Sequence, residues 1–192
     1  MVEASPAPAP AKKPSMLKKV LLGIVGVIGI FLIVVALQPS EFKVTRSATI
    51  AAPASTVFAQ VNDFHQWPAW SPWEKMDPTM KRTYDGAASG NGAGYGWVGN
   101  DKVGEGRMTI TESRAPELIK IKLEFLKPFA ATNAVEFSLK PEGAQTSVTW
   151  AMSGEKNFMM KGFCLFMDMD KHVGGDFERG LANLKTVLES KK

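Results

Sequence analysis

The sequence of 192 residues has one cysteine and two histidines, and these low counts exclude several kinds of site. A single cysteine, Cys164, permits neither an intrachain disulfide nor a cluster of thiolate ligands. It lies between aromatic and aliphatic neighbours, where a small buried thiol is expected. His65 and His172 are far apart in the sequence, so a metal site built from several histidines is excluded. We therefore predict neither a metal nor another cofactor.

The familiar catalytic motifs are also missing. There is no Gly-x-Ser-x-Gly elbow, no His-Glu-x-x-His motif and no phosphate loop followed by a helix. Asp63 and His65 have the residue types of an acid–base pair, but neighbouring polar residues in a loop are usually solvated. His172 is expected at a surface or boundary position, although a histidine in a cavity would titrate near neutral pH. We therefore predict no catalytic residue.

A basic stripe on the folded part is missing as well. The formal net charge is +4, but residues 1–38 carry four of the 23 basic residues and only one of the 19 acidic residues. The remainder of the chain is therefore nearly neutral. A nucleic-acid-binding domain needs clustered Lys and Arg on one face, so this class of function is excluded.

The N-terminal part is expected to contain a membrane anchor. Residues 1–19 are basic and rich in Ala and Pro, which predicts a disordered tail. Residues 20–37 are uncharged and apolar, and this length is close to the roughly 17–25 residues of a membrane-spanning helix. Because the lysines precede this run, the N-terminus is predicted in the cytoplasm and the domain outside it, in the periplasm of a Gram-negative bacterium. A cleaved signal peptide is the alternative, but its apolar region is usually shorter.

Residues 38–41 form a short linker, and residues 42–190 carry the pattern of an α+β domain. Alternating apolar residues and short turns predict an antiparallel sheet with one buried face. The expected strands cover residues 42–50, 81–84, 94–99, 105–112, 119–125, 135–139 and 146–152. A helix is expected from Pro53 to Val61, and the following aromatic segment, 67–73, is expected to form a rigid loop.

The longest helix is predicted at residues 168–190. One apolar stripe follows helical spacing and needs a wide apolar partner; it consists of Val173, Phe177, Leu181, Leu184 and Leu188. Gly174, Gly175 and Gly180 are unusual there, because each glycine costs about 1 kcal/mol relative to alanine. We expect them to permit the close approach of a strand or a ligand.

The apolar segment 157–167 connects the last strand to this helix, and two interpretations remain open. It is either a helical turn packed under the sheet or a pliable, methionine-lined lid over a cavity.

This arrangement resembles the START-like (SRPBCC) superfamily, specifically its polyketide cyclase/dehydrase-type group. Four motifs carry the resemblance: Ile-Ala-Ala-Pro at 50–53, Trp-Ser-Pro-Trp at 70–73, Gly-Tyr-Gly-Trp at 94–97 and Asp-Phe-Glu-Arg-Gly-Leu at 176–181. The resemblance implies a Bet v 1-like helix-grip fold, in which a curved antiparallel sheet wraps around the long C-terminal helix. It also implies a cavity between the sheet and that helix.

The sequence supplies apolar side chains for the wall of such a cavity. The predicted ligand-binding residues are Trp70, Trp73, Tyr95, Trp97, Met108, Phe125, Phe137, Trp150, Met159, Phe163 and Phe177. Each is equally suited to fill a solid core. Because ionisable residues fall mostly on the opposite faces of the strands, we predict binding of a hydrophobic small molecule or lipid rather than catalysis.

Two other functions remain open at this stage. One is a cyclase/dehydrase-like or hydrolase-like enzyme that uses His65, His172 or a carboxylate in the cavity. The other is a membrane-tethered protein-interaction module. The sequence does not predict the oligomeric state.

Overall fold

The structure is a computed structural model, and it describes residues 16–190. Its contacts divide the chain between Gln38 and Pro39 into two units. The first unit contains one helix, α1 (Met16–Leu37), which includes the predicted span 20–37. Residues 16–19 are helical rather than part of the predicted disordered tail, and residues 1–15 of that tail lie outside the described residues. By length and composition α1 is able to cross a membrane, and nearly all of its large apolar side chains are exposed. Signal sequences share these properties.

Within residues 16–190, seven strands form one antiparallel sheet in the order β1-β7-β6-β5-β4-β3-β2. The strands are β1 (Glu41–Ile50), β2 (Lys81–Gly86), β3 (Ala93–Val98), β4 (Glu105–Arg114), β5 (Leu118–Lys127), β6 (Ala131–Glu142) and β7 (Gln145–Glu155). Buried residues alternate with more exposed ones along the central strands, as in β7, where Val148, Trp150 and Met152 face the core. All seven strands expected from the sequence are therefore present.

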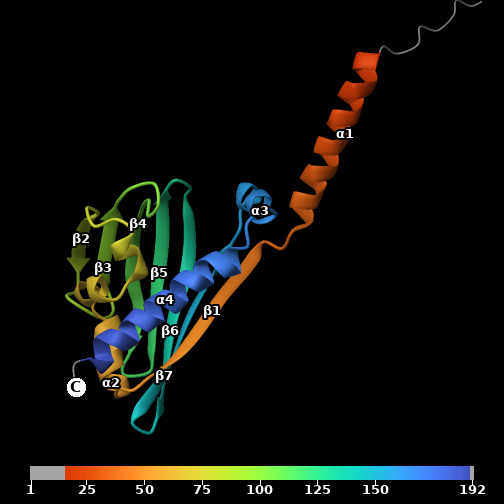
Figure 1. Cartoon of the computed structure of the whole chain (residues 1–192). Coiled ribbons are helices and arrows are strands. Elements are labelled where there is room, and N and C mark those ends of the chain that lie inside the picture. The colour runs from red at the N-terminus through yellow and green to blue at the C-terminus, as the bar shows by residue number, and fades with distance from the viewer. Residues whose placement is uncertain (1–15, 191–192) are drawn as a thin grey trace, which may run out of the picture. The chain divides into compact units, whose positions relative to one another are not determined.

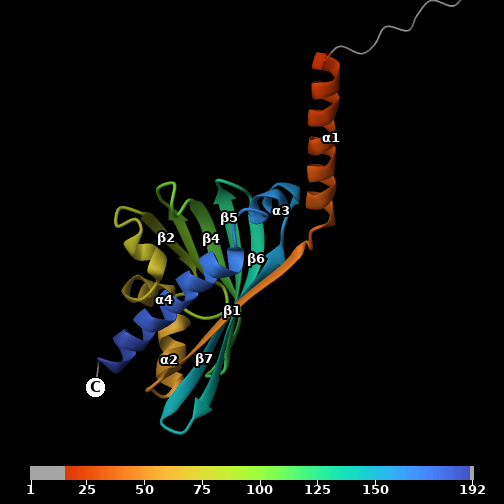
Figure 2. The same ribbon diagram turned by 45° about the vertical axis from the view of Figure 1, so that its right-hand side comes forward.

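Helices α2, η1, η2 and α4 cover the concave face of the sheet, whereas α3 lies at one end of it (Figures 1 and 2). The segment between β1 and β2 forms α2 (Ala54–Val61) and two 3-10 helices, η1 (Phe64–Ala69) and η2 (Pro72–Lys75). After β7 come α3 (Phe158–Cys164) and α4 (Met169–Glu189). Figure 1 shows α4 lying across the strands, which confirms the predicted helix-grip fold.

Two of the unusual glycines explain how α4 lies so close to the sheet. A Cβ atom at Gly174 would collide with the guanidinium of Arg46 on β1, and one at Gly180 would lie 2.7 Å from the Trp150 ring. Arg46 donates a hydrogen bond of 2.6 Å to Glu178 and one of 2.9 Å to Asp170. The guanidinium of Arg46 therefore joins β1 to the first half of α4, and these hydrogen bonds raise its pKa further above its ordinary value.

The structure agrees neither with a helical turn of segment 157–167 packed under the sheet nor with a lid that lines the cavity. No residue of α3 is buried, and no residue of α3 lines the cavity described below. Cys164 is half-buried rather than enclosed. The segment is apolar on nearly all sides, but the apolar stripe of α4 already covers the sheet, so α3 finds no remaining core surface to bury.

Candidate ligand-binding cavity

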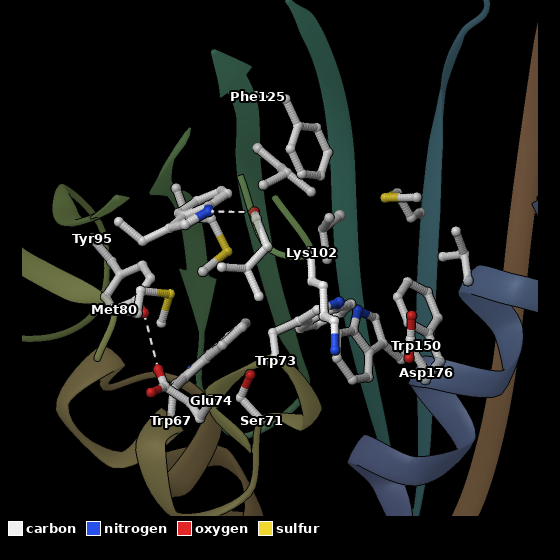
Figure 3. A pocket seen from close by; sticks show the side chains of 18 residues that line it. Trp67, Ser71, Trp73, Glu74, Met80, Tyr95, Lys102, Phe125, Trp150 and Asp176 are labelled. Carbon is white, nitrogen blue, oxygen red and sulfur yellow. Dashed lines mark hydrogen bonds between the residues drawn. The ribbon is translucent and has the colours of Figure 1, made fainter. Parts of the chain in front are cut away.

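A cavity of about 190 Å³ lies between the concave face of the sheet, the first half of α4 and the η1–η2 segment (Figure 3). Strands β3 to β7 provide its back wall, and α4 contributes Val173, Asp176 and Phe177. Most of the side chains around it are aromatic, aliphatic or methionine, so its surface is mainly apolar. The cavity is where the helix-grip fold was expected to place one.

Aromatic stacking makes one side of the cavity rigid. Trp150 of β7 is stacked on Phe177 of α4, with ring centroids 4.1 Å apart and an interplanar angle of 7°. Trp73 of η2 meets Trp150 edge-on at 5.8 Å. Such aromatic pairs add about 0.5–1.5 kcal/mol beyond the burial of their area. The stacked rings therefore link the sheet, α4 and η2 around the cavity.

A buried carboxylate lies on the opposite side (Figure 3). Glu74 of η2 is buried, lines the cavity and accepts a 2.9 Å hydrogen bond from the hydroxyl of Tyr95. Its other oxygen accepts a 2.8 Å hydrogen bond from Nε of Arg82 and also pairs with Nη2 of that residue. Burial, together with the nearby Glu74 carboxylate, raises the pKa of Tyr95. Tyr95 therefore remains protonated and continues to donate to Glu74.

A second ionisable group lies on α4. Asp176 lines the cavity beside Phe177, its side chain is 18% exposed, and it pairs with Arg179 one turn further along the helix. Removal of water from the carboxylate raises the pKa of Asp176, and Arg179 offsets part of that increase. Lys102, from the loop after β3, also lines the cavity while remaining exposed to solvent.

One donor at the cavity has no acceptor. The indole Nε1 of Trp150 is buried and makes no hydrogen bond with any residue that the structure describes. A buried donor without an acceptor costs about 1–3 kcal/mol. The Nε1 atom of Trp70 is also buried without an acceptor among the described residues, but Trp70 does not line the cavity.

The eleven predicted ligand-binding residues occupy three different places. Those that line the cavity are Trp73, Tyr95, Trp97, Met108, Phe125, Trp150 and Phe177. Trp70 and Phe137 are fully buried and pack against Trp150, but neither lines the cavity. Met159 and Phe163 are exposed on α3, outside it. Strand alternation identifies the concave face, but it does not identify which part of that face is left unfilled.

The polar lining groups were missed by the sequence analysis. Ser71, Glu74, Lys102 and Asp176 come from 3-10 turns, a loop and the border of a helical stripe, where no strand alternation applies. The only signal for Glu74 was its place directly after Trp73 in the aromatic segment.

The two histidines do not line the cavity. The exposed His65 bonds to Asp63 at 2.8 Å and stacks on Tyr84 at 4.2 Å. His172 is exposed on α4. Across residues 16–190, no group of three or more His, Cys, Asp or Glu side chains is placed to hold a metal ion.

Comparison with known proteins supports the same fold. Residues 41–189 match the family described as polyketide cyclase / dehydrase and lipid transport. A protein from Mesorhizobium loti superposes with a TM-score of 0.59 at 14% identity, covering 79% of this chain and 99% of that chain. A START superfamily protein from Mycobacterium smegmatis superposes with a TM-score of 0.54 at 16% identity, covering 78% of this chain and 99% of that chain. The Aha1 dimer from Colwellia psychrerythraea superposes with a TM-score of 0.56 at 15% identity, covering 77% of this chain and 96% of that chain. No curated protein sequence matches the chain.

Proposed function

The chain belongs to the polyketide cyclase/dehydrase and lipid transport family, and on this basis we propose that it binds an apolar small molecule or lipid in the cavity beneath α4. The observation that carries the proposal is an unfilled, mainly apolar space in a domain whose remaining core is tightly packed. Ligand sites are typically apolar cavities with a few polar groups that fix orientation. Glu74, Tyr95 and Trp150 are such groups here.

The cavity size limits the ligand. Its volume of about 190 Å³ is below the roughly 300–1,000 Å³ of pockets that enclose a drug-sized molecule. A compact molecule, or one end of a longer chain, suits this space. The unpartnered Nε1 of Trp150 favours a ligand with an oxygen acceptor at that position, because a hydrogen bond there would remove the cost of the buried donor.

The proposal includes anchoring through α1. Lysines precede the helix and no charge interrupts residues 20–37, which favours a cytoplasmic N-terminus and an extracytoplasmic domain. The full chain should remain in the membrane fraction after carbonate and high-salt washes, and a reporter after Lys192 should be active outside the cytoplasm. Recovery of a soluble form cleaved near Leu37 would instead identify a signal peptide.

Ligand binding is tested by comparing the purified full chain with a variant whose cavity is filled. We expect organic extracts of the wild type to contain a molecule, detected by mass spectrometry, that is absent from Val173→Phe prepared in the same detergent. Adding that molecule back should change the tryptophan fluorescence, since Trp73, Trp97 and Trp150 line the cavity. Identical extracts and no saturable fluorescence change would contradict the proposal.

An enzyme is the second candidate, and Glu74 is the observation that favours it. General acid–base catalysis needs a titratable group within reach of the substrate, and Glu74 is a buried carboxylate in the cavity wall. Turnover of a bound ligand that is lost in Glu74→Gln but retained in His65→Ala and His172→Ala would establish this function. Saturable binding without product would favour a binding protein.

A further inference from the structure

The short helix α3 exposes an apolar surface that the cavity does not explain. Phe158, Met159 and Phe163 are 52%, 64% and 56% exposed, and no residue of the helix is buried. Soluble proteins rarely leave several large apolar residues together in water without a binding partner. These three side chains are called the α3 patch below.

The charged side chains within the segment are both lysines. Residues 156–167 contain Lys156 and Lys161 and no Asp or Glu, and Glu155 and Asp168 lie directly outside this range. Apolar side chains flanked by lysines are typical of segments that lie at a membrane surface, where the apolar groups enter the acyl boundary and the ammonium groups meet phosphates.

The start of α3 lies close to the start of the folded unit, Pro39–Lys192. Only Gln38, Pro39 and Ser40 separate Leu37 from β1 in the sequence. The backbone N–H of Lys156, two residues before α3, donates a 2.7 Å hydrogen bond to the carbonyl of Ser40. Thus α3 begins beside Ser40, which follows the last residue of α1 by three positions in the sequence.

Another exposed aromatic residue lies at the same end of the sheet, outside α3. Phe129, in the turn between β5 and β6, is 53% exposed. Strand register places this turn at the end where β7 stops and β1 starts, because Phe125 pairs with Ala131, Asn133 with Gly154 and Glu41 with Glu155. Figures 1 and 2 both show the β5–β6 turn and α3 at this end.

From these observations we propose that the α3 patch inserts into the head-group region of the lipid bilayer and seats the domain on the membrane surface. This inference rests on the proposed anchoring through α1. Residues 165–168 join α3 to α4, whose Val173 and Asp176 line the cavity, so the proposed seating would hold the start of α4 near the membrane surface.

The single cysteine allows a direct test, because Cys164 lies at the end of α3 and is only half-buried. The full chain is labelled there with a polarity-sensitive NBD fluorophore and reconstituted into phosphatidylcholine/phosphatidylglycerol vesicles with or without nitroxide-labelled lipid. The matched control is Gln145→Cys in a Cys164→Ser background, which carries the probe on the turn at the opposite end of the sheet.

We expect nitroxide quenching of the probe at Cys164 to exceed quenching at the control position by about twofold or more. Lipid with the nitroxide near the head group should quench more than lipid with the nitroxide deep in the acyl chain, as for a group about 5–10 Å into the interface. Phe158→Ser combined with Phe163→Ser should reduce quenching to the control level while leaving flotation with the vesicles unchanged.

Flotation without preferential quenching would overturn the α3 proposal alone. A blue shift without quenching would mean that a second copy of the chain covers the patch, and would also overturn it. Failure to float would overturn both the anchor and the α3 proposal.

Discussion

The two halves of the concave face of the sheet are built from similar residues, but one half is filled and the other is hollow. Phe137, Leu181 and Leu184 are fully buried and do not line the cavity. Trp97 on β3 and Phe125 on β5 line open space. The comparison shows that an apolar inward face does not by itself define a core.

The helix that covers the sheet accounts for the difference. The second half of α4 presents Leu181, Leu184 and Leu188 on successive turns, whereas the first half presents Val173 and Asp176 to the cavity beside Phe177. Valine and aspartate occupy less space over the sheet than leucine does. The cavity therefore lies where α4 presents less apolar volume.

Phe137→Ala should produce the largest effect and would test the filled half. Deleting a fully buried phenylalanine costs about 3–5 kcal/mol through lost burial and the new cavity. Phe125→Ala, at the half-exposed edge of the cavity, should cost less than half as much while weakening ligand binding. Urea unfolding of the full chain in micelles, monitored by near-UV circular dichroism, measures both. Equal losses of stability would show that the two halves are packed alike.

Glu74→Gln should have the next largest effect and would test the polar wall of the hollow half. The substitution removes the charge that Arg82 meets, which is expected to lower the free energy of unfolding by about 1.5–3 kcal/mol. Tyr95→Phe removes one hydrogen bond from the same carboxylate and should cost about 1 kcal/mol. If Tyr95→Phe were the more damaging variant, the Glu74–Arg82 pair would not be the main support of this wall.

Val173→Phe should fill the cavity without harming the fold. We expect ligand affinity to fall about tenfold or more, equivalent to about 1.4 kcal/mol. The matched control is Leu181→Phe on the filled half of the same helix, where overpacking should lower the free energy of unfolding by about 1–3 kcal/mol. Val173→Phe should change the free energy of unfolding less than this control does. Comparable destabilisation by both variants would mean that the space beside Val173 cannot accept a side chain.

The sequence was sufficient for the fold and insufficient for the cavity. Strand alternation and the apolar stripe of α4 predicted the sheet and the covering helix, because each depends on a repeated local pattern. Nothing local distinguishes Phe137 from Phe125, since both face inward and only the residue opposite determines whether space remains. The exposure of α3 was missed for a related reason: its composition indicates burial, but α2, η1, η2 and α4 already cover the concave apolar face of the sheet.

Asp176→Asn should have the smallest effect on stability, and this effect should depend on pH. Because burial raises the pKa of Asp176 above its ordinary value of 3.8, the folded chain holds this proton more tightly than the unfolded chain does. The associated stability is fully present below pH 3.8 and is lost as the pH rises through the raised folded pKa. Asp176→Asn should therefore be more stable than the wild type at neutral pH, with the difference shrinking under acid conditions.

Asp170→Asn, on the outer side of α4, should give the opposite sign. Hydrogen bonds from Arg46 lower the pKa of Asp170, so its contribution is present above pH 3.8 and is lost as the pH falls through the lowered folded pKa. This variant should be less stable than the wild type at neutral pH and should approach it in acid. Thermal unfolding of both variants between pH 3 and pH 7 separates the two positions. Parallel pH profiles would mean that the Asp176 carboxylate is as well hydrated as an ordinary surface group, and the first turns of α4 would then not enclose a cavity that excludes water.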